Sequence, residues 1–130
     1  MRSIRIPQDR VGTIIGTKGA TKRMLQKKAG ISMDIDAEEG VIEIKDDAKN
    51  ADPLMALKLI DVVKAIGRGF TPEKSMRLFE EDEYLEVVDL KEIVGSKANQ
   101  LERIRGRLIG KDGKTREIIE ELTGVNMTIY

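Results

Sequence analysis

The stretch IIGTKGATKRMLQKKAG, residues 14–30, returns in altered form as LIGKDGKTREIIEELTG at residues 108–124. When residues 12–35 are aligned with residues 106–129, an offset of 94, eight positions carry the same residue and four of these are glycines. Glycines at matched spacing with apolar residues between them indicate one small structural unit that is used twice. We therefore expect two very small domains rather than one ordinary one.

The composition narrows the class of protein before any motif is considered. The chain has 130 residues and contains no cysteine and no histidine, so neither a disulfide framework nor a thiolate zinc site is available. No run approaches the roughly 18 apolar residues of a membrane span, and the start MRSIRIPQDR lacks the apolar core of a signal peptide. We expect a soluble, cytoplasmic protein with no membrane segment, no cofactor and no metal.

Charge is strongly segregated along the chain, although lysine plus arginine and aspartate plus glutamate number 23 each. Residues 10–28 carry six basic residues and no acidic one, and residues 103–116 carry six basic residues and one acidic one. Residues 34–47 and 80–92 each carry seven acidic residues and one basic one. Because both basic stretches coincide with the glycine phrases, we expect a polyanionic partner to bind there.

Hydrophobic spacing predicts the element order βααββα for residues 1–66. Ile31, Met33 and Ile35 alternate with polar residues as in a strand, and Asp52 followed by Pro53 is typical of a helix start. The expected elements are strands at 4–6, 31–35 and 42–44 and helices at 8–15, 20–29 and 53–66.

The second copy is predicted to be shorter than the first. GRGFTP at 67–72 combines two glycines with a proline, so we expect a linker there and a second domain at residues 73–130. A short helix is expected at 71–79. The other expected elements are a strand at 84–90, helices at 98–109 and 114–123 and a strand at 125–129. This βααβ core lacks a last strand and a closing helix.

The two glycine corners, residues 16–19 and 110–113, are the candidate binding sites. The first N–H groups of the helix after each corner favour an anion, and glycine lets a sugar-phosphate chain approach the backbone closely. Lys18 and Lys111 would add phosphate contacts, whereas Asp112 would oppose them. The candidate nucleic-acid-binding residues are Ile15, Gly16, Thr17, Lys18, Gly19, Lys22 and Arg23 in the first copy and Arg107, Ile109, Gly110, Lys111, Asp112, Gly113, Lys114 and Arg116 in the second.

Set between two helices and flanked by strands, the GTKG and GKDG corners resemble the KH domain family, whose GxxG loop clamps about four single-stranded nucleotides. The resemblance implies an α+β protein with two KH domains. The first would be a complete type I domain (βααββα), and the second would be a βααβ core that is incomplete at its C-terminus. A type II arrangement of residues 73–130 stays open, although only one obvious strand precedes the helices there.

The tandem arrangement resembles a narrower group. IRIPQDRVGTIIGTKG in the first copy and RIRGRLIGKDGKTREIIEELTGVNMTIY in the second are similar to the archaeal partner-of-Nob family of small ribosomal subunit assembly proteins. The resemblance implies binding of single-stranded RNA, namely the 3′ region of small-subunit rRNA during ribosome assembly and rRNA processing. It also implies contacts with a pre-rRNA endonuclease and with a translation initiation factor subunit.

Other functions compete with RNA binding in ribosome assembly. GKT at 113–115 resembles the end of a P-loop, but Leu108 stands where the first glycine belongs, so we expect no enzyme. A helix-turn-helix DNA binder also has two helices that meet at a glycine turn, although flanking strands argue against it. A KH protein of RNA decay or transcription and a protein-interaction module also remain possible. Because aromatic residues are not interleaved with the basic stretches, recognition should depend on phosphate and base-edge contacts rather than on stacking.

Overall fold

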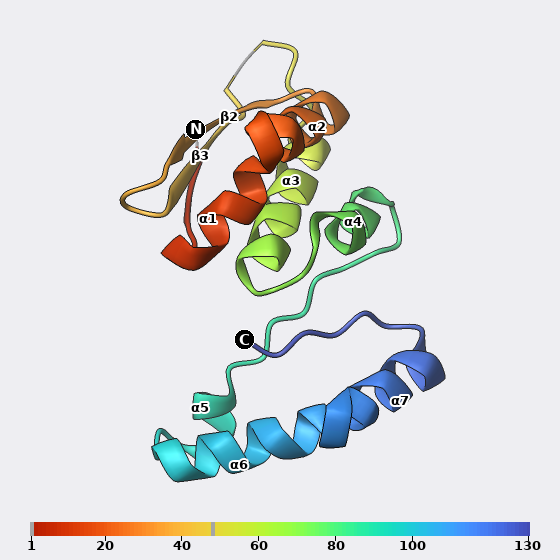
Figure 1. Ribbon diagram of the computed structural model, residues 1–130. Coiled ribbons are helices and arrows are strands. Elements are labelled where there is room, and N and C mark those ends of the chain that lie inside the picture. Colours follow the sequence, from red (N-terminus) through yellow and green to blue (C-terminus); the bar gives the residue numbers. More distant parts are fainter. Residues whose placement is uncertain (1, 48) are drawn as a thin grey trace. The chain divides into compact units, whose positions relative to one another are not determined.

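The chain folds into two compact units, Met1–Leu85 and Glu86–Tyr130 (Figure 1). The computed structural model describes residues 2–47 and 49–130, so Met1 and Ala48 of the predicted first domain lie outside the described residues. No helix in the described part of the chain is long and apolar enough to cross a membrane.

The first unit begins with the predicted order βααββα. Its elements are β1 (Arg2–Arg5), α1 (Gln8–Ile15), the short 3-10 turn η1 (Thr17–Gly19), α2 (Ala20–Ala29), β2 (Ser32–Asp36), β3 (Val41–Lys45) and α3 (Pro53–Gly67). Asp52 caps α3 by accepting a hydrogen bond from the Leu54 N–H at 2.9 Å, with Pro53 in the first turn. The helices and strands predicted between residues 4 and 66 are confirmed.

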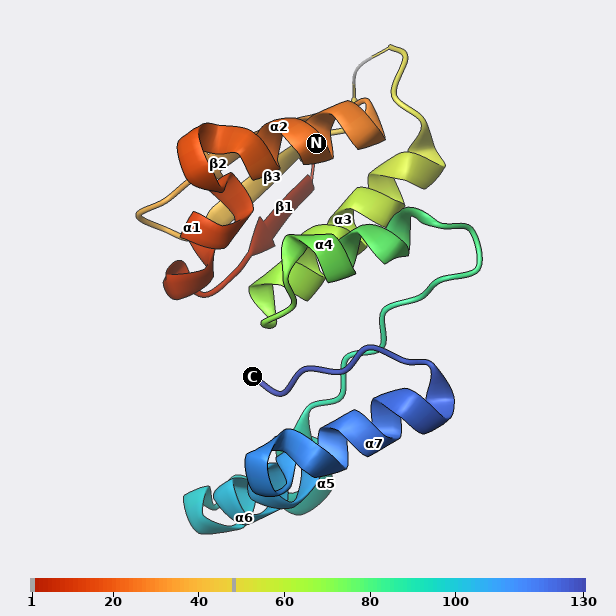
Figure 2. The same ribbon diagram turned by 45° about the vertical axis from the view of Figure 1, so that its right-hand side comes forward.

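The three strands form an antiparallel sheet in the order β1-β3-β2. Ile4 pairs with Ile42 and Met33 pairs with Ile44, so these four side chains share one face and all are buried. The helices α1, α2 and α3 cover that face (Figures 1 and 2). The strand that pairs with both others, β3, therefore holds the sheet together.

Helix α3 supplies much of the hydrophobic core. Leu59, Val62, Val63 and Ile66 are fully buried on it, because their spacing forms one continuous apolar stripe that packs on α1, α2 and the sheet. Burying a side chain of this size stabilises the fold by about 1.5–3 kcal/mol. The first unit therefore depends on α3, which follows all three strands in the sequence, to complete its core.

The segment after α3 folds back on the first unit. The helix α4 (Pro72–Ser75) and the 3-10 turn η2 (Met76–Phe79) pack against α3, and Leu78 and Phe79 are buried there. The Lys58 Nζ donates hydrogen bonds to the carbonyl oxygens of Glu80 and Glu83 at 2.8 and 3.2 Å. Residues 67–72, predicted to be a linker, thus make a turn inside the first unit, which extends to Leu85. The glycines and proline mark the turn, whereas the return of Leu78 and Phe79 to the core is a long-range contact.

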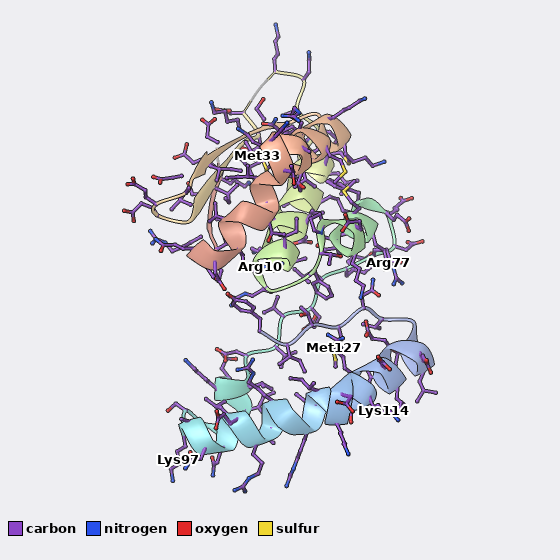
Figure 3. The ribbon with its side chains drawn as sticks, in the orientation of Figure 1. Arg10, Met33, Arg77, Lys97, Lys114 and Met127 are labelled. Carbon is purple, nitrogen blue, oxygen red and sulfur yellow. The ribbon has the colours of Figure 1, made fainter. Side chains whose placement is uncertain are left out.

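Arg10 lies in the first basic stretch but has a structural role. Its Nε donates to the Ile66 carbonyl oxygen at 2.8 Å, and an Nη donates to the Phe70 carbonyl oxygen at 2.9 Å. A positive charge is favoured at the end of α3, where carbonyl groups lack helical partners. Arg10 therefore joins the start of α1 to the end of α3 (Figure 3).

Replacing Arg10 with alanine is expected to destabilise the first unit by about 2 kcal/mol, because two charge-assisted hydrogen bonds to half-buried carbonyl groups are lost. Urea denaturation followed by far-UV circular dichroism measures the change. Arg5→Ala is the control, since Arg5 is exposed on β1. An equal effect of both substitutions would show that the two hydrogen bonds do not stabilise the fold.

The second unit contains α5 (Leu90–Val94), α6 (Ala98–Ile109), the 3-10 turn η3 (Lys111–Gly113) and α7 (Lys114–Thr123). The helices predicted at 98–109 and 114–123 are confirmed. The strands predicted at 84–90 and 125–129 do not form, since residues 83–89 and 124–130 are irregular and α5 begins at Leu90.

The missing strands have a physical explanation in the sheet of the first unit. There β1 and β2 do not pair with each other, because each pairs with β3. Residues 84–90 and 125–129 have strand-like sequences, but among the described residues neither segment pairs with another strand, so their backbone groups lack the hydrogen bonds of a ladder.

Candidate nucleic-acid interface

The two glycine corners have the same backbone conformation. Gly16 has φ 75° and ψ 178°, and Gly110 has φ 75° and ψ 174°. Lys18 (φ 53°, ψ 31°) and Asp112 (φ 56°, ψ 28°) both adopt the left-handed region that few residues other than glycine enter. The repeat in the sequence is thus a repeat in three-dimensional structure at these corners.

Glycine is required where each corner begins. A Cβ on Gly16 would lie 2.3 Å from the Thr21 Oγ1, and one on Gly110 would lie 2.2 Å from the Thr115 Oγ1. Thr21 and Thr115 occupy matched positions, so each threonine packs closely against its own glycine. This contact brings the end of one helix against the first turn of the next.

Gly16→Ala is expected to destabilise the first unit by about 2 kcal/mol, because its φ and ψ are essentially restricted to glycine and the new Cβ would overlap Thr21. The matched control is Gly12→Ala in α1, where a Cβ meets no atom within 4 Å and alanine favours the helix. Urea denaturation should show opposite signs for the two variants. A stable Gly16→Ala variant would contradict this account of the corner.

The charges around the two corners differ in arrangement. In the first copy Lys18 and Arg23 are exposed and Lys22 is half-buried, and the Arg23 guanidinium donates to the Lys18 carbonyl oxygen at 2.7 Å. In the second copy Glu117 takes the position of Arg23. The first corner therefore has basic residues on both the loop and the following helix.

The second corner has its basic residues more widely spread. Lys111 and Lys114 are exposed, and Arg107 is exposed on α6, which precedes the corner. Asp112 is exposed between the two lysines. Figure 3 shows Lys114 at the start of α7. The second corner is therefore less positive than the first, as its sequence predicts.

The remaining candidate residues lie beside the corners. Ile15 and Ile109 are half-buried at the ends of α1 and α6, and Ile15 packs against the hydrophobic core of the first unit. Thr17 is exposed, whereas Gly19 and Gly113 are half-buried. The structure thus places these residues beside their own corner, whereas Arg116 is half-buried on α7 and its Nε lies 3.8 Å from the Glu120 Oε1.

Lys22 lies within electrostatic reach of the strand that follows α2. The Lys45 Nζ pairs with the Asp34 Oδ2 at 2.8 Å and holds the pKa of that carboxyl group below its ordinary value, with a smaller contribution from the charge of Lys22.

In the described part of the chain, no group of three or more acidic side chains is arranged to hold a metal ion.

Sequence reasoning missed one pair of residues at the interface. The Gln26 Oε1 accepts a hydrogen bond from the Met33 N–H at 2.8 Å, and the Glu120 Oε2 accepts one from the Met127 N–H at 3.1 Å. Figure 3 labels Met33 and Met127. The segment after α7 is thus tied to that helix by the same bond that ties β2 to α2. In the sequence, the only feature that links Gln26 to Glu120 is that they occupy matched positions of the repeat.

Two families of domain match the chain. Residues 1–56 match the KH domain family, and residues 84–130 match the family described as the eukaryotic type KH-domain (KH-domain type I). The second match favours type I over the type II arrangement that the sequence left open.

Curated relatives extend over nearly the whole chain. A KH domain-containing protein of Methanocaldococcus jannaschii is 44% identical over 98% of this chain and 55% of its own length. The pre-rRNA-processing protein PNO1 of Debaryomyces hansenii is 26% identical over 98% of this chain and 51% of its own length. The chain thus spans about half the length of these relatives.

A solved structure agrees closely in fold. Dim2p of Pyrococcus horikoshii OT3 is 43% identical and has a TM-score of 0.91 over 99% of this chain and 75% of that one. Dim2p has also been solved in a complex with a/eIF2alpha and rRNA, where the TM-score is 0.90 over 99% of this chain and 70% of that one. The level of identity, the coverage and the two KH matches agree, and this chain belongs to the partner-of-Nob (Dim2p) family of KH-domain proteins.

Proposed function

We propose that this chain binds single-stranded RNA through both glycine corners. The observation that carries the proposal is the repeated corner itself, with one backbone conformation, close glycine-threonine packing and basic side chains in each copy. Phosphates would contact Lys18, Lys111 and the backbone of residues 16–19 and 110–113. In the described part of the chain no side chain caps α2 or α7 at its start, which leaves space for an anion there, whereas the Ala20 and Lys114 N–H groups already donate to the Thr17 and Lys111 carbonyl oxygens.

The RNA that we propose is the 3′ region of small-subunit rRNA during ribosome assembly. The pre-rRNA-processing name of the Debaryomyces hansenii relative and the rRNA complex of the Pyrococcus horikoshii relative support this assignment. The a/eIF2alpha subunit in that complex supports a translation initiation factor as a partner of this chain. A pre-rRNA endonuclease is the further partner that the family suggests. The chain would bind and present RNA without catalysing its cleavage.

Bases would lie against the segment that follows each second helix. In the first unit this segment is β2, which lies at the edge of the sheet and pairs with β3. Recognition would then combine phosphate contacts at the corner with hydrogen bonds to base edges along the strand, as single-stranded RNA requires.

Titration of the full chain with single-stranded oligoribonucleotides, followed by amide NMR, tests the proposal. The signals of residues 16–19 and 110–113 are expected to shift, and duplex DNA of equal length is expected to compete poorly. Preferential binding of the duplex would favour a helix-turn-helix function. Unchanged signals with every oligonucleotide would favour a protein-interaction module.

A further inference from the structure

The edge of β2 that faces α2 is partly closed by a side chain. Met33 lies opposite Ile44 of β3, yet its N–H points to the Gln26 Oε1 rather than to β3. Backbone groups of residues two apart in a strand point the same way, so those of Ile35 face the same edge. Gln26 therefore sits where α2 meets the strand edge proposed to contact bases.

The backbone fixes which end of the Gln26 amide is available. Because the Oε1 accepts the Met33 N–H, the Nε2 with its two hydrogens is directed elsewhere, and it has no hydrogen-bond partner among the residues that the structure describes. Gln26 is half-buried, and its Nε2 is not among the fully buried side-chain nitrogens, so this group keeps some contact with solvent. The first copy thus offers a hydrogen-bond donor at this point.

The second copy offers the opposite chemistry at the matched position. The Glu120 Oε2 accepts the Met127 N–H, and the Oε1 forms an ion pair with the Arg116 Nε at 3.8 Å, a distance too long for a hydrogen bond, so this oxygen can still accept one. An ionised carboxylate only accepts hydrogen bonds. Both side chains are held by one kind of backbone bond, but the first presents N–H groups and the second presents an oxygen.

We propose that Gln26 and Glu120 are specificity-determining residues that give the two copies different base preferences. This inference rests on the proposed RNA binding. At the base next to this position, the first copy would favour uracil, whose O4 accepts a hydrogen bond, and the second would favour cytosine, whose N4 amino group donates one. Uracil and cytosine have nearly the same size, so the donor or acceptor at position 4 separates them.

Exchanging glutamine and glutamate at positions 26 and 120 tests whether these side chains determine the base preference of each copy. Gln26→Glu and Glu120→Gln are isosteric, and each keeps an oxygen for the Met33 or Met127 N–H, so the fold should be preserved. Gln26→Glu is measured with the second corner weakened by Lys111→Asp. Glu120→Gln is measured with the first corner weakened by Thr17→Asp and Lys18→Asp. The probes are oligouridine and oligocytidine, and the readout is the ratio of their dissociation constants in the full chain.

We expect Gln26→Glu to shift this ratio about tenfold toward oligocytidine and Glu120→Gln to shift it about tenfold toward oligouridine, which corresponds to one hydrogen bond. The ratio cancels the general effect of a changed net charge. Lys27→Gln and Glu121→Gln are the controls, because they change the charge by the same amount at exposed neighbouring positions and should leave the ratio unchanged.

The possible outcomes separate the inference from the function on which it depends. If Asp substitutions in the corners weaken binding of both probes while the ratios stay constant, RNA binding stands and the role of Gln26 and Glu120 is rejected. If the corner substitutions leave binding unchanged, the proposed function itself is rejected.

Discussion

Asp substitutions in both corners are expected to lower the affinity for single-stranded RNA about a hundredfold. Thr17→Asp with Lys18→Asp changes the charge of the first corner by three units, and Lys111→Asp changes that of the second by two. A pair of unit charges at about 4 Å in water is worth about 1 kcal/mol, so partial engagement of these five units gives about 3 kcal/mol. Fluorescence anisotropy with a labelled oligoribonucleotide measures the loss.

The substitutions should leave the backbone of the corners intact. Asp112 already occupies the left-handed position in the second corner, at φ 56° and ψ 28°, so aspartate at position 18 needs no new backbone conformation. The control is Lys64→Asp with Lys74→Asp, which changes four charge units at exposed sites on α3 and α4, outside the corners. An equal loss of affinity in this control would mean that net charge, rather than the corners, governs binding.

Salt provides an independent check on the same contacts. For single-stranded nucleic acid, the slope of log K against log salt concentration is about −0.7 for each phosphate contact. The variant with both corners changed should therefore show a shallower slope than the unchanged chain. A lower affinity with the same slope would indicate that the substitutions disturb base contacts and leave the phosphate contacts in place.

The elements that sequence predicted best are those governed by nearby residues. The helices at 8–15 and 20–29 follow from apolar spacing and from glycines that end them, and both were confirmed at the predicted bounds. The strands predicted at 84–90 and 125–129 did not form, because a strand also needs a partner whose position depends on the whole fold. The return of Leu78 and Phe79 to the core depends in the same way on distant contacts with α3.

In the candidate site, too, features formed by neighbouring residues could be predicted, whereas contacts between distant residues could not. The glycines of both corners could be predicted from sequence because the turn that they form is local. Arg10 was counted among the basic residues near the first corner, yet its guanidinium bonds to the carbonyl groups of Ile66 and Phe70, far along the chain. Gln26 and Glu120 were missed because their matched positions in the repeat do not show which backbone group each side chain will bind.

Leu59→Ala is expected to destabilise the first unit by about 3–4 kcal/mol. Leu59 is fully buried on α3, and removing a buried leucine side chain loses its transfer free energy and leaves a cavity. A domain of this size is stable by only about 5–15 kcal/mol, so the loss is a large fraction of the total. Urea denaturation followed by far-UV circular dichroism measures it.

The matched control for Leu59 lies on the same helix. Leu57 is 49% exposed, so Leu57→Ala removes the same atoms with little burial lost and should change the stability by less than about 1 kcal/mol.

The second unit has no buried position that corresponds to Leu59. Its Ile118 and Leu122 are 54% and 81% exposed, and no residue of this unit is fully buried. The corner is formed by local contacts, and it occurs in both units. The buried core depends on α3 and β3, and it is found in the first unit but not in residues 86–130. Equal destabilisation by Leu57→Ala and Leu59→Ala would contradict this division between a local corner and a core that depends on α3.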